Sequence, residues 1–314
     1  MIVVNRLVSV IIPHFNGILF LKETLQSVLN QDYSHLEIIV VDDHSDESQL
    51  NEFWNLNIIW PDIKLFKRPN NLPKGANSCR NFGFLMSSGE YINFIDSDDL
   101  ILKEKISKQI KFFRDNRHLD VVVCKTFNFH GASSNIISSW QKENFYIDSD
   151  YLSLYLSNRA LWCTNSALIR RSCFEKISFL EGQLYANEWL LFTRMMVNGY
   201  KIGGLNDYFV LRRTHSNSLG RISSSKKLKY FIEARLFIHE SISNSLMESK
   251  EVYLNFLIHD LNSFLKSSAK YGLWVLFNST LKKIKISWFL RIRALFIFLI
   301  LFLLKKGDTF KVIK

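Results

Sequence analysis

The stretch Tyr-Ile-Asn-Phe-Ile-Asp-Ser-Asp-Asp occupies residues 91–99 and decides how the fold is interpreted. Its first five residues are rich in aromatic and β-branched types, which predicts a buried strand, and acids follow at once. Two earlier predicted strands end in the same way: residues 8–12 run into the loop 13–16, and residues 37–41 run into Asp42 and Asp43. Ligands of open α/β sheets bind beyond the carboxyl ends of the strands. We therefore expect the three polar clusters to form one site.

The segments around these strands alternate between strand and helix patterns. After the first strand, apolar residues recur at helical spacing, at Leu21, Leu25, Val28 and Leu29. Further helices are predicted over 74–86, 106–113 and 189–196, further strands over 63–66 and 120–127, and a mostly helical region over 226–281. Because this alternation is typical of βαβ units, the predicted fold class is α/β, with a mainly parallel central sheet flanked by helices.

Composition excludes several other classes of protein. The chain has 314 residues, 47% apolar and 14% aromatic, so it can bury a large core and is not a disordered chain. Its four cysteines form no CxxC pair, which favours a reducing compartment. The short apolar run over 7–12 stops at Pro13, so we expect no secretory signal and a cytoplasmic protein.

Asp96 and Asp98 are the residues of this stretch with the clearest chemistry. Two carboxylates one residue apart at a strand end can share Mg²⁺ or Mn²⁺, and such an ion keeps positions free for phosphate oxygens of a substrate. The same residues also suit a solvated turn or a helix N-cap, because Asp is common at both. Taken alone, the cluster fits both interpretations equally.

Five short motifs occur in a recognisable order and spacing. They are VSVIIPHFN at 8–16, VVDDHS at 40–45, RNFG at 80–83, SGEYI at 88–92 and DSDD at 96–99. Together they closely resemble the family 2 glycosyltransferases of the GT-A fold. The resemblance is strong over residues 7–110, weaker over residues 111–220, and does not cover the tail.

This resemblance implies a nucleotide-diphospho-sugar donor, usually a UDP-sugar, and transfer of a hexosyl group with inversion at the anomeric carbon. It also implies a donor site in which loops after the first two strands bind the nucleoside, a basic residue lies near the nucleotide, and a DxD motif binds the metal and the ribose. These roles fall on Pro13, Phe15, Asn16, Asp42, Asp43, Lys74, Arg80, Asp96, Ser97 and Asp98, with Asp98 and Asp96 as the expected ligands of Mn²⁺ or Mg²⁺. A metal with a nearby cation would neutralise the charge on the departing nucleoside diphosphate.

The later part of the resemblance implies the catalytic base. Residues 187–189, Asn-Glu-Trp, resemble the family's Glu-Asp-Trp motif, in which the second acid deprotonates the acceptor hydroxyl. The chain departs from that motif, because its pair is Asn187 and Glu188. Glu188 is the expected base, and the dipole at a helix N-terminus favours a carboxylate there. The alternative is that Glu188 only stabilises the first turn of its helix.

Residues 213–218, Arg-Thr-His-Ser-Asn-Ser, resemble the family's RxHxxS segment, which closes over the diphosphate. The resemblance implies that Arg213 clamps a phosphate oxygen and that His215 binds phosphate or completes the metal shell. A lone histidine in a loop is otherwise commonly solvated, and this alternative stays open for His215.

The C-terminal third carries the net charge of +11. Residues 201–314 have 20 Lys and Arg against 7 Asp and Glu, whereas residues 1–200 have 20 against 22. The apolar run 294–304 would form about 16 Å of helix, half of a bilayer core, and a longer span would include the costly Arg291 and Arg293. We therefore predict an in-plane anchor over 282–306, with its cations on anionic headgroups.

The tail also fits two other interpretations. A buried helix could pack against residues 256–265 or against a second subunit, so an oligomer is left open. Nucleic-acid binding is disfavoured, because the cations flank a continuous apolar run instead of interleaving with aromatic residues on a polar face. We therefore expect no nucleic-acid partner.

The sequence thus predicts a GT-A catalytic domain over 1–222 and a helical basic extension over 223–314. The predicted function is metal-dependent, inverting sugar transfer to a glycan or lipid-linked acceptor of bacterial surface polysaccharide, by an enzyme peripheral to the inner face of the cell membrane. Two other hypotheses remain. One is a non-catalytic nucleotide-sugar-binding or scaffold protein, which the altered pair at 187–188 motivates, and the other is a basic adaptor on a membrane surface or nucleic acid.

Overall fold

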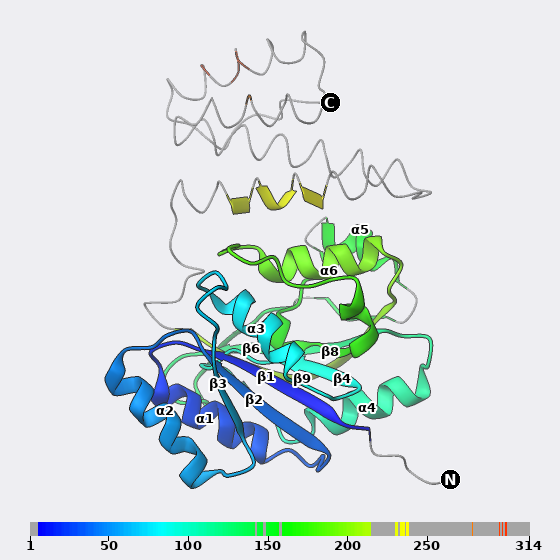
Figure 1. Ribbon diagram of the computed structural model, residues 1–314. Helices are drawn as coiled ribbons and strands as arrows, with labels where there is room; N and C mark the ends of the chain where they lie inside the picture. The colour runs from blue at the N-terminus through cyan, green and yellow to red at the C-terminus, as the bar shows by residue number, and fades with distance from the viewer. Residues whose placement is uncertain are drawn as a thin grey trace. The chain divides into compact units, whose positions relative to one another are not determined.

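The computed structural model describes residues 6–141, 143–146, 149–156 and 159–214, together with a few residues between 230 and 299. Two compact units are distinguished, Met1–Ser218 and Leu219–Lys314. The architecture given below is that of the first unit (Figure 1). In the second unit, the described residues between 230 and 238 are helical, and Ala234 and Ile238 among them are buried.

A mixed sheet of nine strands forms the centre of the first unit, counted over its described residues. The strand order is β3-β2-β1-β4-β8-β6-β9-β5, and β7 pairs with β6. Four strands are parallel to one another: β1 (Val8–His14), β2 (Leu36–Asp42), β3 (Lys64–Lys67) and β4 (Tyr91–Phe94). The others are β5 (Leu100–Ile101), β6 (Val121–Phe129), β7 (Ile136–Ser139), β8 (Leu168–Arg170) and β9 (Ile202–Arg213). Because β8 is antiparallel to both β4 and β6, the sheet is mixed in its second half.

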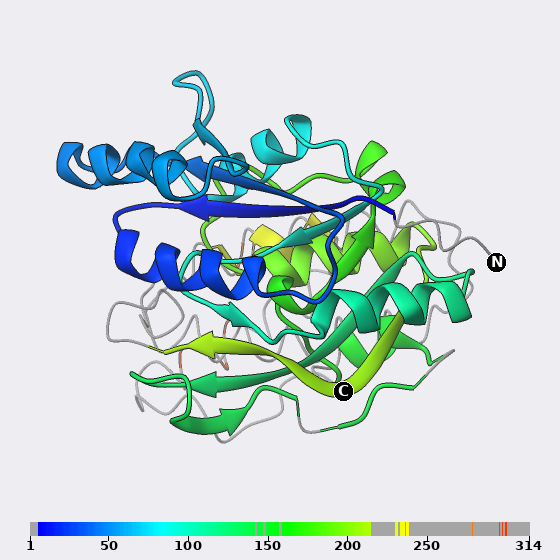
Figure 2. The ribbon, with the colours of Figure 1, turned by 90° about the horizontal axis from the view of Figure 1, so that it is seen from below.

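Helices cover both faces of this sheet (Figure 1). On one face lie α1 (Ile18–Leu29), α2 (Glu47–Ile59) and α4 (Lys105–Asp115), and Figure 2 shows α1 and α4 in front of the strands. On the other face lie α3 (Ala76–Leu85), α5 (Tyr151–Leu156) and α6 (Asn187–Val197). Two short 3-10 turns, η1 (Thr164–Ser166) and η2 (Arg171–Glu175), flank β8. The α/β fold predicted from the sequence is confirmed.

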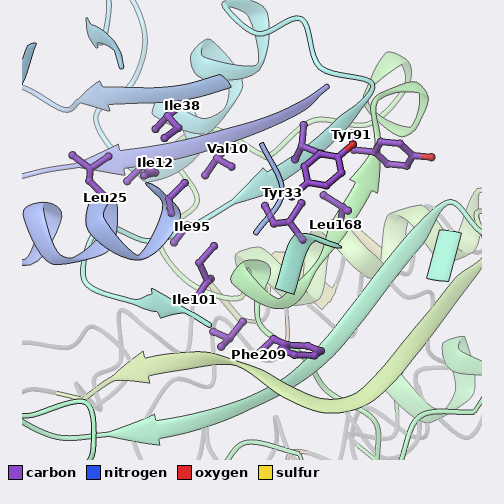
Figure 3. Close-up of a cluster of buried hydrophobic side chains, with 14 of the residues drawn as sticks. Val10, Ile12, Leu25, Tyr33, Ile38, Tyr91, Ile95, Ile101, Leu168 and Phe209 are labelled. Carbon is purple, nitrogen blue, oxygen red and sulfur yellow. The ribbon is translucent and has the colours of Figure 1, made fainter. Parts of the chain in front are cut away.

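The strands divide their side chains between two hydrophobic cores, as a period of two residues requires. In β1, Val10 and Ile12 pack with Leu25 of α1 and Ile38 of β2 (Figure 3). Ile11 points to the opposite core, which contains residues of α3, α5 and α6. Because both faces of the sheet are covered, the parallel strands are continuous apolar runs rather than alternating ones.

The observed elements agree with the predicted ones to within two residues wherever an element was predicted in the first unit. The helix predicted over 189–196 begins at Asn187, so Asn187 and Glu188 lie in its first turn as expected. The sequence patterns did not indicate α2, α5, β5, β7, β8 or β9. No helix within the described part of the chain is long and apolar enough to cross a membrane. The predicted anchor over 282–306 lies almost entirely outside the described residues.

One buried carboxylate fixes the amino ends of the strands. Glu37 of β2 accepts hydrogen bonds from the Ser9 hydroxyl, from Lys64 Nζ (2.8 Å) and from the backbone N–H groups of Ser88 (2.5 Å) and Gly89 (2.9 Å). Burial opposes ionisation of Glu37, but these hydrogen bonds outweigh it and lower its pKa to about 2. The SGEYI motif is therefore held to β1 and β2 through a charged acceptor.

Candidate active site

The loops that follow β1, β2 and β4 lie at one edge of the sheet, as predicted. His14 and Asp42 are register partners at the ends of the parallel strands β1 and β2. The backbone N–H of Asn16 donates to Ser45 Oγ (2.9 Å), and the Asn16 side chain exchanges two hydrogen bonds with Asp46 (2.9 and 2.8 Å). Because β4 is parallel to β1 on its other side, the acidic loop after β4 leaves the sheet at the same edge.

Backbone strain gathers around this edge. Among the described residues, the non-glycine residues with a left-handed φ are Asn16 (46°), His44 (63°) and Ala186 (61°). Asn16 follows β1, His44 follows β2, and Ala186 directly precedes α6. Such conformations cost about 1–3 kcal/mol each and persist where surrounding contacts enforce them, commonly at functional sites. The backbone conformation therefore indicates the same edge of the sheet as the polar side chains do.

The two acids after β2 are buried and have protein partners. Asp42 accepts hydrogen bonds from the backbone N–H (3.0 Å) and hydroxyl (2.5 Å) of Ser45, which shapes the turn. Asp43 forms an ion pair with Arg68 Nε at 2.5 Å, and both side chains are almost fully buried. Sequence reasoning missed Arg68. The signal that could have found it is its place just beyond the third predicted strand, at the same edge as the acids.

Arg80 of α3 lies against the acidic loop. Its Nη2 forms an ion pair with Asp96 Oδ1 at 2.5 Å, and its Nη1 donates to Asn77 Oδ1 at 3.0 Å. The guanidinium is 6% exposed and stacks over the Phe179 ring at 5.1 Å, whereas 36% of the Asp96 side chain is exposed. Its Nε has no hydrogen-bond partner among the described residues. Arg80 therefore places a permanent positive charge directly beside the acidic loop.

The acidic loop is fixed from behind by Asp99. Its Oδ1 accepts the backbone N–H of Arg213 (2.7 Å), and its Oδ2 accepts the side-chain amide of Asn165. Asn165 Oδ1 in turn accepts the backbone N–H of Asp96 at 3.3 Å. Burial, together with the charges of Asp98 and Asp96, raises the pKa of Asp99 well above its ordinary value. Asp99 is buried by these contacts. The neighbouring Asp96, Ser97 and Asp98 are only half-buried, so part of each residue is exposed to solvent.

A buried lysine supports the same segment from the sheet. Lys105 is fully buried at the start of α4, and its Nζ donates to Asn93 Oδ1 at 3.0 Å. Asn93 Nδ2 donates to the Ala167 carbonyl (2.7 Å), at the end of the turn that carries Asn165. Burial lowers the pKa of Lys105 to about 8. This polar layer holds the turn η1, and through Asn165 it holds the acidic loop.

The residues present fit a divalent metal that is bound partly by substrate. Asp96 and Asp98 offer hard carboxylate oxygens, and Mg²⁺ commonly uses one or two carboxylates together with phosphate oxygens. Within the described part of the chain, no group of three or more His, Cys, Asp or Glu side chains is arranged to hold a metal ion. The third predicted ligand, His215, lies outside the described residues. Two carboxylates would leave coordination positions of such an ion free for substrate oxygens.

Arg213 has other partners than the predicted phosphate oxygen. Its Nε donates to the Asp98 carbonyl (2.9 Å), its Nη1 to the Gly131 carbonyl (3.1 Å), and its Nη2 to Glu23 Oε2 (2.5 Å). The side chain is 6% exposed. In this conformation Arg213 holds the loop between β4 and β5 against β9, and the predicted contact with a ligand stays a prediction.

The loop after β1 presents an aromatic face to solvent. Pro13 is buried as part of β1, whereas 45% of Phe15 is exposed. Lys74 Nζ lies over the Phe15 ring, 4.1 Å from its centroid. The structure thus brings the predicted Phe15 and Lys74 together, and an exposed ring with a cation beside it can stack with a base and attract its phosphates.

Glu188 lies in the first turn of α6. That turn is tied to α3, because Asn187 Oδ1 accepts a hydrogen bond from Asn77 Nδ2 at 2.9 Å. Burial raises the pKa of Tyr155 well above its ordinary value, and the negative charge of Glu188 adds to this effect. Glu188 is half-buried. A carboxylate in this position can accept a proton from a hydroxyl group that solvent or a substrate brings to it.

Solved structures share the fold of this chain. The chain superposes on Staphylococcus aureus TarS 1–349 in complex with UDP-GlcNAc with a TM-score of 0.64, at 22% identity, over 96% of this chain and 88% of that chain. It also superposes on the mannosyltransferase PcManGT of Pyrobaculum calidifontis, with a TM-score of 0.57 and 15% identity, over 96% and 84% of the two chains. These superpositions show that the fold is GT-A.

The sequence comparisons identify the family to which this chain belongs. The sequence profile of glycosyl transferase family 2 matches residues 9–178, more than half of the chain, so this chain belongs to that family. A glycosyltransferase of Haemophilus influenzae, described as uncharacterized, is 32% identical over 179 residues, 55% of this chain and 66% of that protein. The Escherichia coli UDP-Glc:alpha-D-GlcNAc-diphosphoundecaprenol beta-1,3-glucosyltransferase WfaP is 27% identical over 231 residues, 72% of this chain and 83% of that protein. The predicted family is confirmed.

Proposed function

We propose that this chain is an inverting, metal-dependent glycosyltransferase that uses a nucleotide-diphospho-sugar, preferentially a UDP-sugar. One observation carries the proposal: hydrogen bonds run from Asp96 through Arg80 and Asn77 to Asn187, the neighbour of Glu188. Groups suited to a diphosphate and a carboxylate suited to a base are thereby held in one connected site.

The reaction follows from these positions. The acceptor oxygen forms a bond to the anomeric carbon while the bond from that carbon to the diphosphate oxygen breaks. Glu188 takes the proton of the acceptor hydroxyl, and the nucleoside diphosphate leaves with the electron pair. Attack opposite to the leaving group inverts the anomeric carbon. A positioned base of this kind contributes about 10²–10⁴-fold to the rate.

Arg80 and the acidic loop act on the leaving group. Negative charge grows on the diphosphate as the sugar departs, and a fixed cation near it stabilises that charge in the transition state. Asp98 and Asp96 would hold Mn²⁺ or Mg²⁺ here. When bound, the metal supplies Lewis-acid neutralisation of the same phosphate oxygens. Arg80 is pre-positioned, because its ion pair with Asp96 and its bond to Asn77 fix the guanidinium.

The uridine preference and the acceptor class are supported by the proteins this chain resembles. WfaP is named for a UDP-glucose donor and a diphosphoundecaprenol-linked acceptor, and the TarS structure holds UDP-GlcNAc. We extend both features to this chain as a working assignment: a UDP-sugar donor, and a glycan or lipid-linked acceptor in bacterial surface polysaccharide biosynthesis.

A lipid-linked acceptor fits a location on the inner face of the cell membrane, which we propose for the segment 282–306. Five lysines flank its apolar run: Lys282, Lys283, Lys285, Lys305 and Lys306. Each cation near an anionic surface contributes about 1 kcal/mol. The full chain should sediment with vesicles that contain anionic lipid, and a full-length variant with these lysines changed to Gln should remain in the supernatant. Equal sedimentation of both proteins would overturn the anchor.

The catalytic proposal is tested with a panel of nucleotide-sugars, with Mn²⁺ and with EDTA. One donor should raise the melting temperature by mass action and should be turned over to the free nucleoside diphosphate. Asp98→Asn should lose both the metal-dependent stabilisation and turnover. Binding of a donor without turnover, with any acceptor tried, would favour the non-catalytic nucleotide-sugar-binding protein that the Asn187–Glu188 pair suggests.

A further inference from the structure

Asn77 of α3 has a buried side chain, and both the nitrogen and the oxygen of its amide group have hydrogen-bond partners. Its Nδ2 lies 2.7 Å from the Leu180 carbonyl, 3.3 Å from the Gln183 carbonyl and 2.9 Å from Asn187 Oδ1. Its Oδ1 accepts a hydrogen bond from Arg80 Nη1 at 3.0 Å. Only 3% of Asn77 is exposed. One amide therefore connects the predicted donor-site arginine with the first turn of the helix that bears Glu188.

The bond to Asn187 is the long-range part of this connection. This direct hydrogen bond joins two residues that are 110 positions apart in the sequence. The Glu-Asp-Trp motif has an acid at the position of Asn187. The side-chain oxygen of Asn187 can still accept a hydrogen bond, but the side chain carries no charge. The neighbouring Ala186 has a left-handed φ of 61°, and a strained entry to α6 needs contacts that hold it.

We propose that Asn77 and Asn187 are positioning residues, which fix the first turn of α6 so that Glu188 faces the sugar bound beside Arg80. This inference rests on the proposed function. Asn187 accepts the hydrogen bond of Asn77 and thereby holds Glu188 in place. For this reason the altered Asn-Glu pair is compatible with catalysis. A displacement of about 1 Å at a catalytic group can lower a rate by about 10²-fold.

The chain offers a matched control one turn further along α3. Asn81 anchors the same loop: its Nδ2 donates to the Phe179 carbonyl (3.0 Å) and to Glu181 Oε1 (3.2 Å), and its Oδ1 accepts the Phe179 N–H (3.0 Å). None of these hydrogen bonds is made with Arg80, Asn77 or Asn187; Phe179 contacts the Arg80 guanidinium only through its ring. Asn81→Ala therefore removes loop hydrogen bonds of the same kind and leaves those that link Arg80, Asn77 and Asn187 in place.

The experiment compares four full-length variants with the wild type: Asn187→Ala, Asn187→Asp, Asn77→Ala and Asn81→Ala. Asn187→Ala should lower kcat by about ten-fold or more and leave the donor KM and the Kd for UDP within about two-fold. Asn187→Asp keeps the acceptor oxygen and should restore kcat to within about three-fold of the wild type. Asn77→Ala should lower kcat and also weaken UDP binding, because Arg80 loses its support. Asn81→Ala should change each quantity by less than about two-fold.

A second readout separates this inference from the proposed function. Hydrogen exchange of the backbone amides in the first turns of α6 should be faster in Asn77→Ala and Asn187→Ala than in Asn81→Ala and the wild type, whether or not a donor is turned over. Equal exchange in all proteins would overturn the connection. So would an Asn187→Ala enzyme with wild-type kcat, or an Asn81→Ala enzyme that loses as much. A wild type that exchanges as expected but neither binds nor uses any donor would sink the proposed function alone.

Discussion

Gly83 lets α3 approach the sheet closely, and a single methyl group at this position should disturb both stability and the donor site. An ideal Cβ on residue 83 would lie 2.5 Å from Ile11 Cγ2 and 3.3 Å from Val41 Cγ2. Carbon atoms attract best at about 3.5–4.0 Å, so α3 would have to move outward by about 1 Å. Arg80 lies one turn earlier on the same helix and would move with it.

The size of the effect can be worked out from two opposing terms. Overpacking of a close contact costs about 1–3 kcal/mol. Alanine is better than glycine in a helix interior by about 1 kcal/mol, which offsets part of that cost. The net loss for Gly83→Ala is therefore up to about 2 kcal/mol. For a unit of this size, a loss of this magnitude lowers Tm by up to about 8 °C.

Thermal unfolding and kcat/KM for the donor are the measurements that check Gly83→Ala. Leu85→Ala is a suitable control, because Leu85 lies on the same helix and is 70% exposed. We expect the control to retain wild-type Tm and activity, and Gly83→Ala to lose stability and at least about ten-fold in kcat/KM through Arg80. A Gly83→Ala protein as stable and as active as Leu85→Ala would refute the close packing on which the position of Arg80 depends.

Three further predictions concern charged side chains. The pKa of Glu37 is lowered to about 2, so its stabilisation is present above the unfolded value near 4.5 and is lost as pH falls toward 2; in urea unfolding, Glu37→Gln should be less stable than the wild type at pH 6, and the difference should shrink with acidification. The pKa of Lys105 is lowered to about 8, so the folded state binds fewer protons than the unfolded state between pH 8 and 10.5. The free energy of unfolding of the wild type should therefore rise by up to about 3 kcal/mol relative to Lys105→Met across that range. Unfolding measured at a series of pH values tests this. Lys74→Ala should weaken UDP binding by about three- to ten-fold with little change in Tm, because its cation beside Phe15 is exposed, and calorimetric titration with UDP would contradict this if the two affinities were equal.

The position of the site is predictable from the sequence, because the parallel strands are apolar runs that end where the chain leaves the core. The runs at 8–12, 37–41 and 91–95 each stop at polar residues, and the structure brings the loops that follow to one edge. The rule that ligands lie at the carboxyl ends of such strands needs no knowledge of contacts.

Elements without a clean periodic pattern escape this reasoning. The helix α2 buries Phe53 and Leu56 but exposes Trp54, Ile58 and Ile59, so its apolar residues do not form one stripe. The strand β8 has three residues and is fixed by antiparallel pairing with β4 and β6, which come from distant parts of the chain. Neither feature leaves a signal in its own segment.

The partners of the site residues depend on tertiary approach and are the least predictable part. Arg80 is expected near the nucleotide, but its ion pair with Asp96 and the clasp of Asp99 by Asn165 follow only from how α3, η1 and the acidic loop meet. Arg213 shows the reverse case. The sequence points it at a phosphate, whereas carbonyl groups of two loops and Glu23 surround it in the structure.

The most direct test is the turnover of Glu188→Gln with the donor that the panel identifies, measured together with its affinity for UDP. If a carboxylate on α6 removes the acceptor proton beside a nucleotide held at the edge of β1, β2 and β4, the variant should bind UDP like the wild type and transfer sugar about 10²–10⁴-fold more slowly. Transfer at the wild-type rate by Glu188→Gln would show that the proton leaves by another route.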